Sequence, residues 1–134
     1  MRKGKEKSGR LSVFKGREAR LNRAIFHIVA LKGPLTTYDI HKEVKAQRGL
    51  GYTPYANVNK RVRALEELGY VKEIGVKKTK AGFEAFIYEL FAKAYLAILL
   101  NSINLEDLLA RVNEATASAI LGGLASAREF VLEA

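Results

Sequence analysis

Apolar residues recur at intervals of three and four over residues 17–31, and this spacing predicts an amphipathic helix that stops at Gly33 and Pro34. A second, shorter helix is expected to begin at Thr36 or Thr37, because either hydroxyl can accept a hydrogen bond from the first helical turn. The chain therefore opens with two helices joined by a short, proline-containing segment.

Two glycines, Gly49 and Gly51, permit a tight turn, and the apolar pattern then predicts a third helix over residues 54–68. Thr53 is expected to cap this helix, and Pro54 suits its first turn. The apolar stripe recurs at spacings of four, three and three, and consists of Val58, Val62, Leu65 and Leu68. At about 100° per residue the other side of the helix carries small, amide and basic side chains. These are Ala56, Asn57, Asn59, Lys60 and Arg63.

Residues 70–76 and 83–90 follow as two strands, because apolar and polar positions alternate along the second of them. The hairpin segment between them, residues 77–82, has three lysines in four positions: Lys77, Lys78 and Lys80. Lysines at a hairpin tip can simply protect a strand edge. Beside a basic helix they favour a second interpretation, in which they contact backbone phosphates.

The last third of the chain is markedly apolar. Residues 91–100 contain a single charge, Asn104 is expected to cap a further helix, and residues 115–127 are rich in alanine, serine and glycine. These helices could pad the core of one chain. A helix that is apolar on most sides needs burial on most sides, however, so we favour a homodimer formed through residues 91–134.

The net charge of the chain indicates the class of its partner. The chain has 23 lysines and arginines against 14 acidic residues, a formal charge of +9, and residues 1–20 hold eight basic and two acidic side chains. Such a surplus favours a polyanionic partner. Residues 1–16 form a basic arm, which is either a solvated tail or a segment that contacts phosphates or enters a minor groove. Its candidate contacts are Arg2, Lys3, Lys5, Lys7 and Arg10.

The sequence disfavours metal binding, catalysis and insertion into a membrane. Cysteine is absent, and His27 and His41 stand fourteen positions apart without acidic residues at ligand spacing, so we expect no metal site. There is no glycine-rich phosphate loop and no credible catalytic constellation, so we expect neither an enzyme nor a cofactor. No signal peptide or membrane span is evident, which predicts a soluble, cytoplasmic protein that does not enter a membrane.

The stretch from Val58 to Glu73 resembles the recognition helix and first wing strand of winged-helix transcriptional regulators, including the PadR-like and MarR-like groups. The matching positions are Arg63, Leu65, Glu66, Gly69, Tyr70 and Val71. The segment from Gly33 to Ile40 resembles the second helix of those proteins and its lead-in. The resemblance does not decide between the two groups. It implies a mainly α fold with a small β-hairpin wing (α+β), in which residues 17–90 form a winged helix-turn-helix domain followed by C-terminal helices.

Pattern and resemblance together predict a sequence-specific, double-stranded DNA-binding transcriptional regulator. The helix at residues 54–68 would enter the major groove, and the lysine wing at 77–82 would contact the phosphate backbone. The residues expected to contact the DNA phosphate backbone are Thr37, Tyr55, Arg61, Lys77, Lys78 and Lys80. Two alternatives stay open: a non-specific architectural nucleic-acid-binding protein, and a winged helix that docks a protein. A small-molecule effector is compatible with the sequence but has no support in it.

Overall fold

The computed structural model describes residues 11–126, and these fall into two compact units that divide between Asn101 and Ser102. The first unit contains the helices and strands that were expected of a DNA-binding domain. The second unit contains two helices. Each unit is described here by itself.

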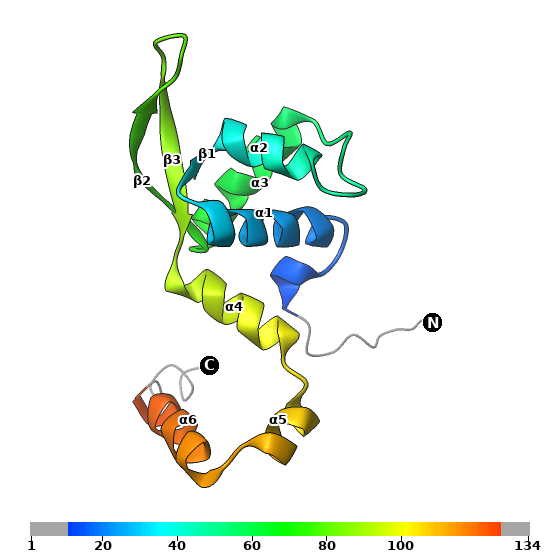
Figure 1. The fold of residues 1–134 in the computed structure, drawn as a ribbon, viewed down its shortest axis with the longest axis vertical. Helices are drawn as coiled ribbons and strands as arrows, with labels where there is room; N and C mark the ends of the chain where they lie inside the picture. The colour runs from blue at the N-terminus through cyan, green and yellow to red at the C-terminus, as the bar shows by residue number, and fades with distance from the viewer. Residues whose placement is uncertain (1–10, 127–134) are drawn as a thin grey trace. The chain divides into compact units, whose positions relative to one another are not determined.

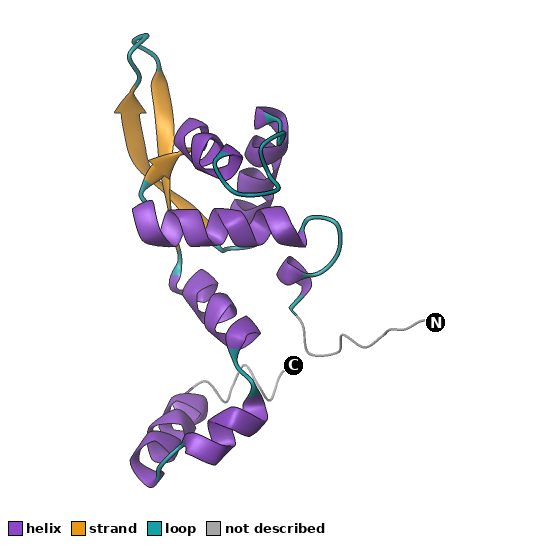
Figure 2. Cartoon of the chain, turned by 45° about the vertical axis from the view of Figure 1, so that its right-hand side comes forward, coloured by secondary structure: helices purple, strands orange, loops and turns teal. Residues whose placement is uncertain are grey.

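The first unit has the element order of a winged helix (Figure 1). Its helices are a short 3-10 helix and four α-helices: Ser12–Phe14, α1 (Ala19–Lys32), α2 (Thr37–Lys45), α3 (Tyr55–Glu67) and α4 (Ala92–Ser102). Its strands are β1 (Leu35–Thr36), β2 (Val71–Lys78) and β3 (Glu84–Leu90). They form one antiparallel sheet in the order β1-β3-β2, and the β2–β3 hairpin extends past the helices (Figure 2). The predicted fold class, helices with a small β-hairpin wing, is confirmed.

Local chemistry explains where α2 begins. The Thr36 hydroxyl accepts a hydrogen bond from the Asp39 backbone N–H at 3.1 Å, and the Asp39 carboxylate lies in the positively polarised first turn. The predicted threonine cap is therefore present at the first of the two positions considered. Thr36 also pairs with Ile87 in the sheet, so this residue joins the start of α2 to β3.

Strand β1 was not predicted. It contains only Leu35 and Thr36, which is too short to show a period of two, and it is held by pairing with Tyr88 and Ile87 on β3. The β2–β3 ladder has an irregularity between Glu73 and Gly75. A bulge of this kind bends a strand and increases its twist.

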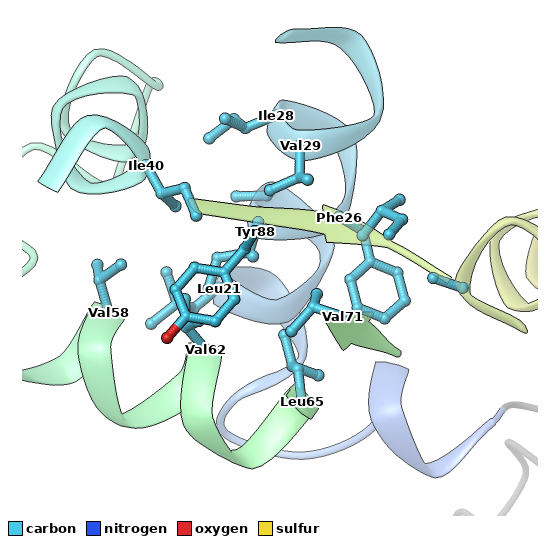
Figure 3. Packing of buried hydrophobic residues seen from close by; sticks show 14 of the residues in the cluster. Leu21, Phe26, Ile28, Val29, Ile40, Val58, Val62, Leu65, Val71 and Tyr88 are labelled. Atoms are coloured by element: carbon cyan, nitrogen blue, oxygen red, sulfur yellow. The ribbon is translucent and has the colours of Figure 1, made fainter. Parts of the chain in front are cut away.

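The core lies between helices α1, α2 and α3 and the sheet (Figure 3). Phe26, which lies off the apolar stripe of α1, is fully buried between Phe14 and Tyr70, with ring centroids 5.4 and 5.3 Å away. Phe14 stands in the segment that we assigned to the basic arm, and it is as deeply buried as Phe26. The folded domain thus includes the 3-10 helix and starts before residue 17.

The start and end of α3 differ from prediction. The capping position is Pro54, and the Thr53 hydroxyl instead donates to the Leu50 carbonyl at 2.8 Å. At the other end the helix stops at Glu67, so Leu68 no longer follows the helical stripe and its side chain is 51% exposed. The carbonyl of Leu68 accepts a hydrogen bond from Lys93 Nζ at 2.7 Å, which ties α4 to the end of α3.

Within its described residues, 102–126, the second unit forms α5 (Leu105–Arg111) and α6 (Glu114–Ser126). The predicted cap is present, since Asn104 Oδ1 accepts a hydrogen bond from the Asp107 N–H at 3.1 Å. Gly122 and Gly123 lie inside α6 and do not interrupt it. None of the side chains described in residues 102–125 is buried. Among the helices of residues 11–126, none has the length and apolar character needed to cross a membrane.

Candidate nucleic-acid interface

The inner side of α3 determines which of its side chains face outward. Val58, Val62 and Leu65 have almost no exposed surface and pack in the core with Ile40 and Val44 of α2 (Figure 3). Because these three positions fix the rotation of the helix about its axis, the side chains on the opposite side must face solvent.

Those outward positions hold most of the predicted base-contacting set. Ala56, Asn57, Lys60 and Arg63 are exposed on α3, and Asn59 is half-buried at the edge of the same surface. We call these five residues the outer face of α3. Glu67, also exposed, adds one negative charge where the helix ends. The N-terminal two-thirds of the helix therefore presents amide and basic groups in an uninterrupted series.

Residues 46–54 connect α2 to α3 and form a longer segment than the tight glycine turn that we predicted. Gly49 has a φ of +83°, which only glycine adopts without strain. The connection is held by backbone–backbone hydrogen bonds and by His41, whose Nε2 lies 2.9 Å from the Thr53 carbonyl oxygen. The His41 ring also meets Tyr55 edge to face at 5.6 Å. The first turn of α3 is thus anchored to α2.

The wing presents its lysines at and beside the turn between β2 and β3. Thr79 closes the turn by donating its N–H to the Phe83 carbonyl at 2.7 Å, and Gly82 supplies a φ of +89°. Lys77, Lys78 and Lys80 are all exposed. Two have acidic neighbours: Lys77 Nζ lies 3.7 Å from Asp39 Oδ2, and Lys78 pairs with Glu84 across the ladder. Lys80 lies in the turn itself.

The other residues expected to contact the DNA phosphate backbone lie outside the wing and differ in their burial. Thr37 is buried in the first turn of α2. Arg61 is half-buried, and its Nε donates to Asn22 Oδ1 at 3.0 Å, while Asn22 Nδ2 donates to the Val13 carbonyl at 2.9 Å. Tyr55 is partly exposed beside the outer face of α3. Arg61 is therefore hydrogen-bonded inside the domain and Thr37 is buried, and the structure places neither on the outer face of α3.

Two exposed tyrosines were missed by the sequence reasoning. Tyr38 lies in the first turn of α2 with Lys42 Nζ 5.7 Å from its ring centroid, and Tyr52 is fully exposed in the connection before α3. The signal for Tyr38 was available, because it lies on the side of α2 away from Ile40 and Val44. Nothing in the local sequence marks Tyr52, whose exposure depends on the path of the connection.

Tyr88 couples the outer face electrostatically to the sheet. Burial raises the pKa of its phenol, and the carboxylates of Glu66 and Glu73 raise the pKa further, while the positive charge of Arg63 lowers it. The phenol is therefore neutral at physiological pH, and the Arg63 charge lies close enough to affect it.

The arm residues Arg2, Lys3, Lys5, Lys7 and Arg10 lie outside the described part of the chain. Within residues 11–126, no three histidine, cysteine or acidic side chains come together in a way that could hold a metal ion.

Comparison with known proteins gives little beyond this. No family model matches the chain, and no curated protein matches it. One similar solved structure is that of FabT from Streptococcus pneumoniae in complex with DNA. That likeness has a TM-score of 0.45 and 15% sequence identity, and covers 92% of this chain and 85% of FabT.

Proposed function

We propose that the protein is a dimeric, sequence-specific, double-stranded DNA-binding transcriptional regulator. The observation that carries the proposal is the outer face of α3. Ala56, Asn57, Lys60 and Arg63 face solvent together, while the core holds the helix by its opposite side. The major groove of DNA admits an α-helix, and a helix packed firmly on its inner side can present its outer side chains to the bases.

The side chains on that face have the chemistry of base recognition. Asparagine forms a bidentate pair with adenine, and lysine or arginine bonds the acceptors of guanine. Asn57 lies in the first turns of α3, and Lys60 and Arg63 follow at spacings of three. Ala56 leaves room for close approach and can contact a thymine methyl group.

The wing supplies contacts of the other kind. Lys77, Lys78 and Lys80 are exposed on a hairpin that extends past the helices (Figure 1). Lysine contacts with phosphates position a protein on the duplex and contribute salt-dependent affinity, but they carry no sequence information. The basic residues of the arm, between Arg2 and Arg10, are assigned to the same role.

Dimerisation through the C-terminal region explains the surface of α4. This helix buries Ala94 and Ala97 against the rest of the first unit, and Ile98 packs partly against the same core. Four other large side chains are between 50% and 55% exposed: Tyr95, Leu96, Leu99 and Leu100. Leaving such a contiguous apolar surface in water is unfavourable by about 25 cal/mol per Å².

The second unit also exposes apolar side chains that favour burial. Leu105 and Leu109 of α5 and Leu121 and Leu124 of α6 are largely exposed, and the described residues of this unit bury no side chain. A second copy of the chain would cover these surfaces, as it would those of α4. A two-fold dimer would also place two α3 helices on successive major grooves, about 34–36 Å apart.

The test is a fluorescence anisotropy titration against the DNA upstream of the protein's own gene, with random duplex as competitor and the salt concentration varied. Strong preference for the upstream DNA at two protomers per site supports the regulator. Equal, steeply salt-dependent binding to both duplexes favours the architectural alternative, and no binding at low salt favours a protein-docking role.

A further inference from the structure

A basic cleft lies between α1 and the connection that follows α2, and none of its lining residues belongs to α3 or to the wing. Three side chains of α1 line one side of it, Arg20, Arg23 and His27, and Gln47 and Arg48 line the other. Its volume is about 390 Å³. The α1 residues are spaced by three and four positions, which puts them on one side of the helix.

Arg20 is held in place by the connection. Its Nη2 donates to the Arg48 carbonyl at 3.2 Å, and its guanidinium lies over Gly49, where a Cβ atom would overlap it. Gly49 also has the left-handed φ of +83° that favours glycine. The glycine therefore serves two purposes: it turns the chain and it leaves space for a guanidinium whose other N–H groups remain available.

Arg23 is restrained from a different direction. Its Cζ lies 6.0 Å from the centroid of the Phe14 ring, which is buried and fixed in the core. Two guanidinium groups, one on each of two successive turns of α1, are thus oriented before any ligand arrives. Preorganised donors lose little conformational freedom when they bind.

The charge in the cleft is not neutralised by the lining side chains. These are three arginines, a histidine and a glutamine, together with the apolar Ala24 and Leu50, and no carboxylate lines the cleft. The ion pairs formed within the described ranges use Lys32, Lys72 and Lys77, and none uses a cleft arginine. All the charged groups are donors, which suits an anion and not a cation.

We propose that this cleft is a binding site for a phosphate-bearing anion, separate from the outer face of α3 and from the wing. Planar guanidinium groups bind phosphate oxygens in a bidentate manner. Ala24 and Leu50 provide an apolar surface for an organic portion, and the volume lies within the usual range of small-ligand pockets. The phosphate belongs either to a small phosphate ester or to the backbone of a bound duplex, and only the second source rests on the proposed function.

The first experiment is isothermal titration calorimetry of the full chain with sodium pyrophosphate. The test variant is Arg20→Gln with Arg23→Gln, which keeps much of each side chain and removes two charges. Lys42→Gln with Lys45→Gln removes the same charge from exposed positions of α2 outside the cleft. Wild type and control should bind one equivalent alike, and the test variant should bind at least about tenfold more weakly. Arg48→Gln, a change of one exposed side chain, should weaken binding too without disturbing α1.

The second experiment distinguishes the two sources of phosphate through the salt dependence of random-duplex binding. If the cleft contacts the duplex, the test variant should lower the slope of log K against log salt by about two contacts more than the control does. Arginine-dependent pyrophosphate binding with equal slopes assigns the cleft to a small ligand, and it would stand even if the chain bound no DNA. Pyrophosphate binding that is absent or equal in all variants, together with equal slopes, would overturn the proposal.

Discussion

Asn22 is a single polar residue on which the position of α3 depends. Its side chain is only 3% exposed, and it joins three separate parts of the domain: α1, the Val13 carbonyl and the Arg61 guanidinium of α3. A buried amide with both of its ends bonded is stabilising, whereas its partners become costly once they lose it. We infer that this link supplements the apolar packing of Val62 and Leu65.

Substituting Asn22 with alanine should therefore reduce the free energy of unfolding by about 1–3 kcal/mol, because the buried Val13 carbonyl and the half-buried Arg61 Nε lose their hydrogen-bond partner. Urea denaturation measures this directly. Asn57→Ala, which removes the same group from an exposed position on α3, is the matched control and should change stability by no more than about 0.5 kcal/mol. Equal losses for the two variants would remove the structural role assigned to Asn22.

Lys60 tests base recognition at the scale of one side chain. Lys60→Ala should relax the preference of the protein at one base pair of its site, by about 1–3 kcal/mol of discrimination. The measurement is affinity for a set of duplexes that differ by single base pairs. Lys45→Ala removes a charge from the end of α2 and should leave the preference unchanged. A Lys60→Ala protein with full discrimination would exclude that residue from the recognition surface, and Arg63→Ala should behave as Lys60→Ala does.

At the scale of elements, the wing is expected to act through charge alone. Lys80→Ala, which alters the turn between β2 and β3, should weaken binding to all duplexes alike and reduce the salt slope by about one contact. Lys77→Ala should have a smaller effect on affinity, since its charge is already shared with Asp39 at 3.7 Å. A loss of specificity at an unchanged slope would show instead that the wing contacts bases.

The elements also show which features the sequence could predict. The outer face of α3 was predictable because helical geometry places it once Val58, Val62 and Leu65 are known to be buried. The start of α2 was predictable because a threonine cap is a local interaction. By contrast, β1 depends on pairing with β3, and the link from Arg61 to Asn22 joins residues 39 positions apart. Local patterns contain no information about such partners.

The misplaced start of α3 has a similar cause. The Thr53 hydroxyl could either cap the helix or form a hydrogen bond with the preceding turn. The path of the connection places it beside the Leu50 carbonyl, to which it donates. Leu68 fits the apolar spacing, but the helix has ended by that point, so its side chain is exposed. Phe14 was assigned to the arm because its partner, Phe26, lies on another element.

At the scale of the whole molecule, binding to two half-sites requires a second copy of the chain. Leu99→Lys would place a charge in the middle of the exposed apolar side of α4 and should convert a dimer into monomers, with weaker binding to a two-half-site duplex. Sedimentation velocity gives the mass. Leu31→Lys is the control, because Leu31 is the same residue type, 83% exposed, at the end of α1. A monomeric wild type, or a dimeric Leu99→Lys variant, would exclude this interface.

In the proposed dimer, two copies of α3 contact successive major grooves. Hydroxyl-radical and methylation-protection footprinting on the DNA upstream of the gene would detect these contacts. We predict two protected guanine-containing segments in the major groove, centred about 10 base pairs apart, with protected backbone beside each where the wing lysines lie. Protection spread uniformly along the duplex, or a footprint confined to backbone positions with no protected bases, would rule out this arrangement.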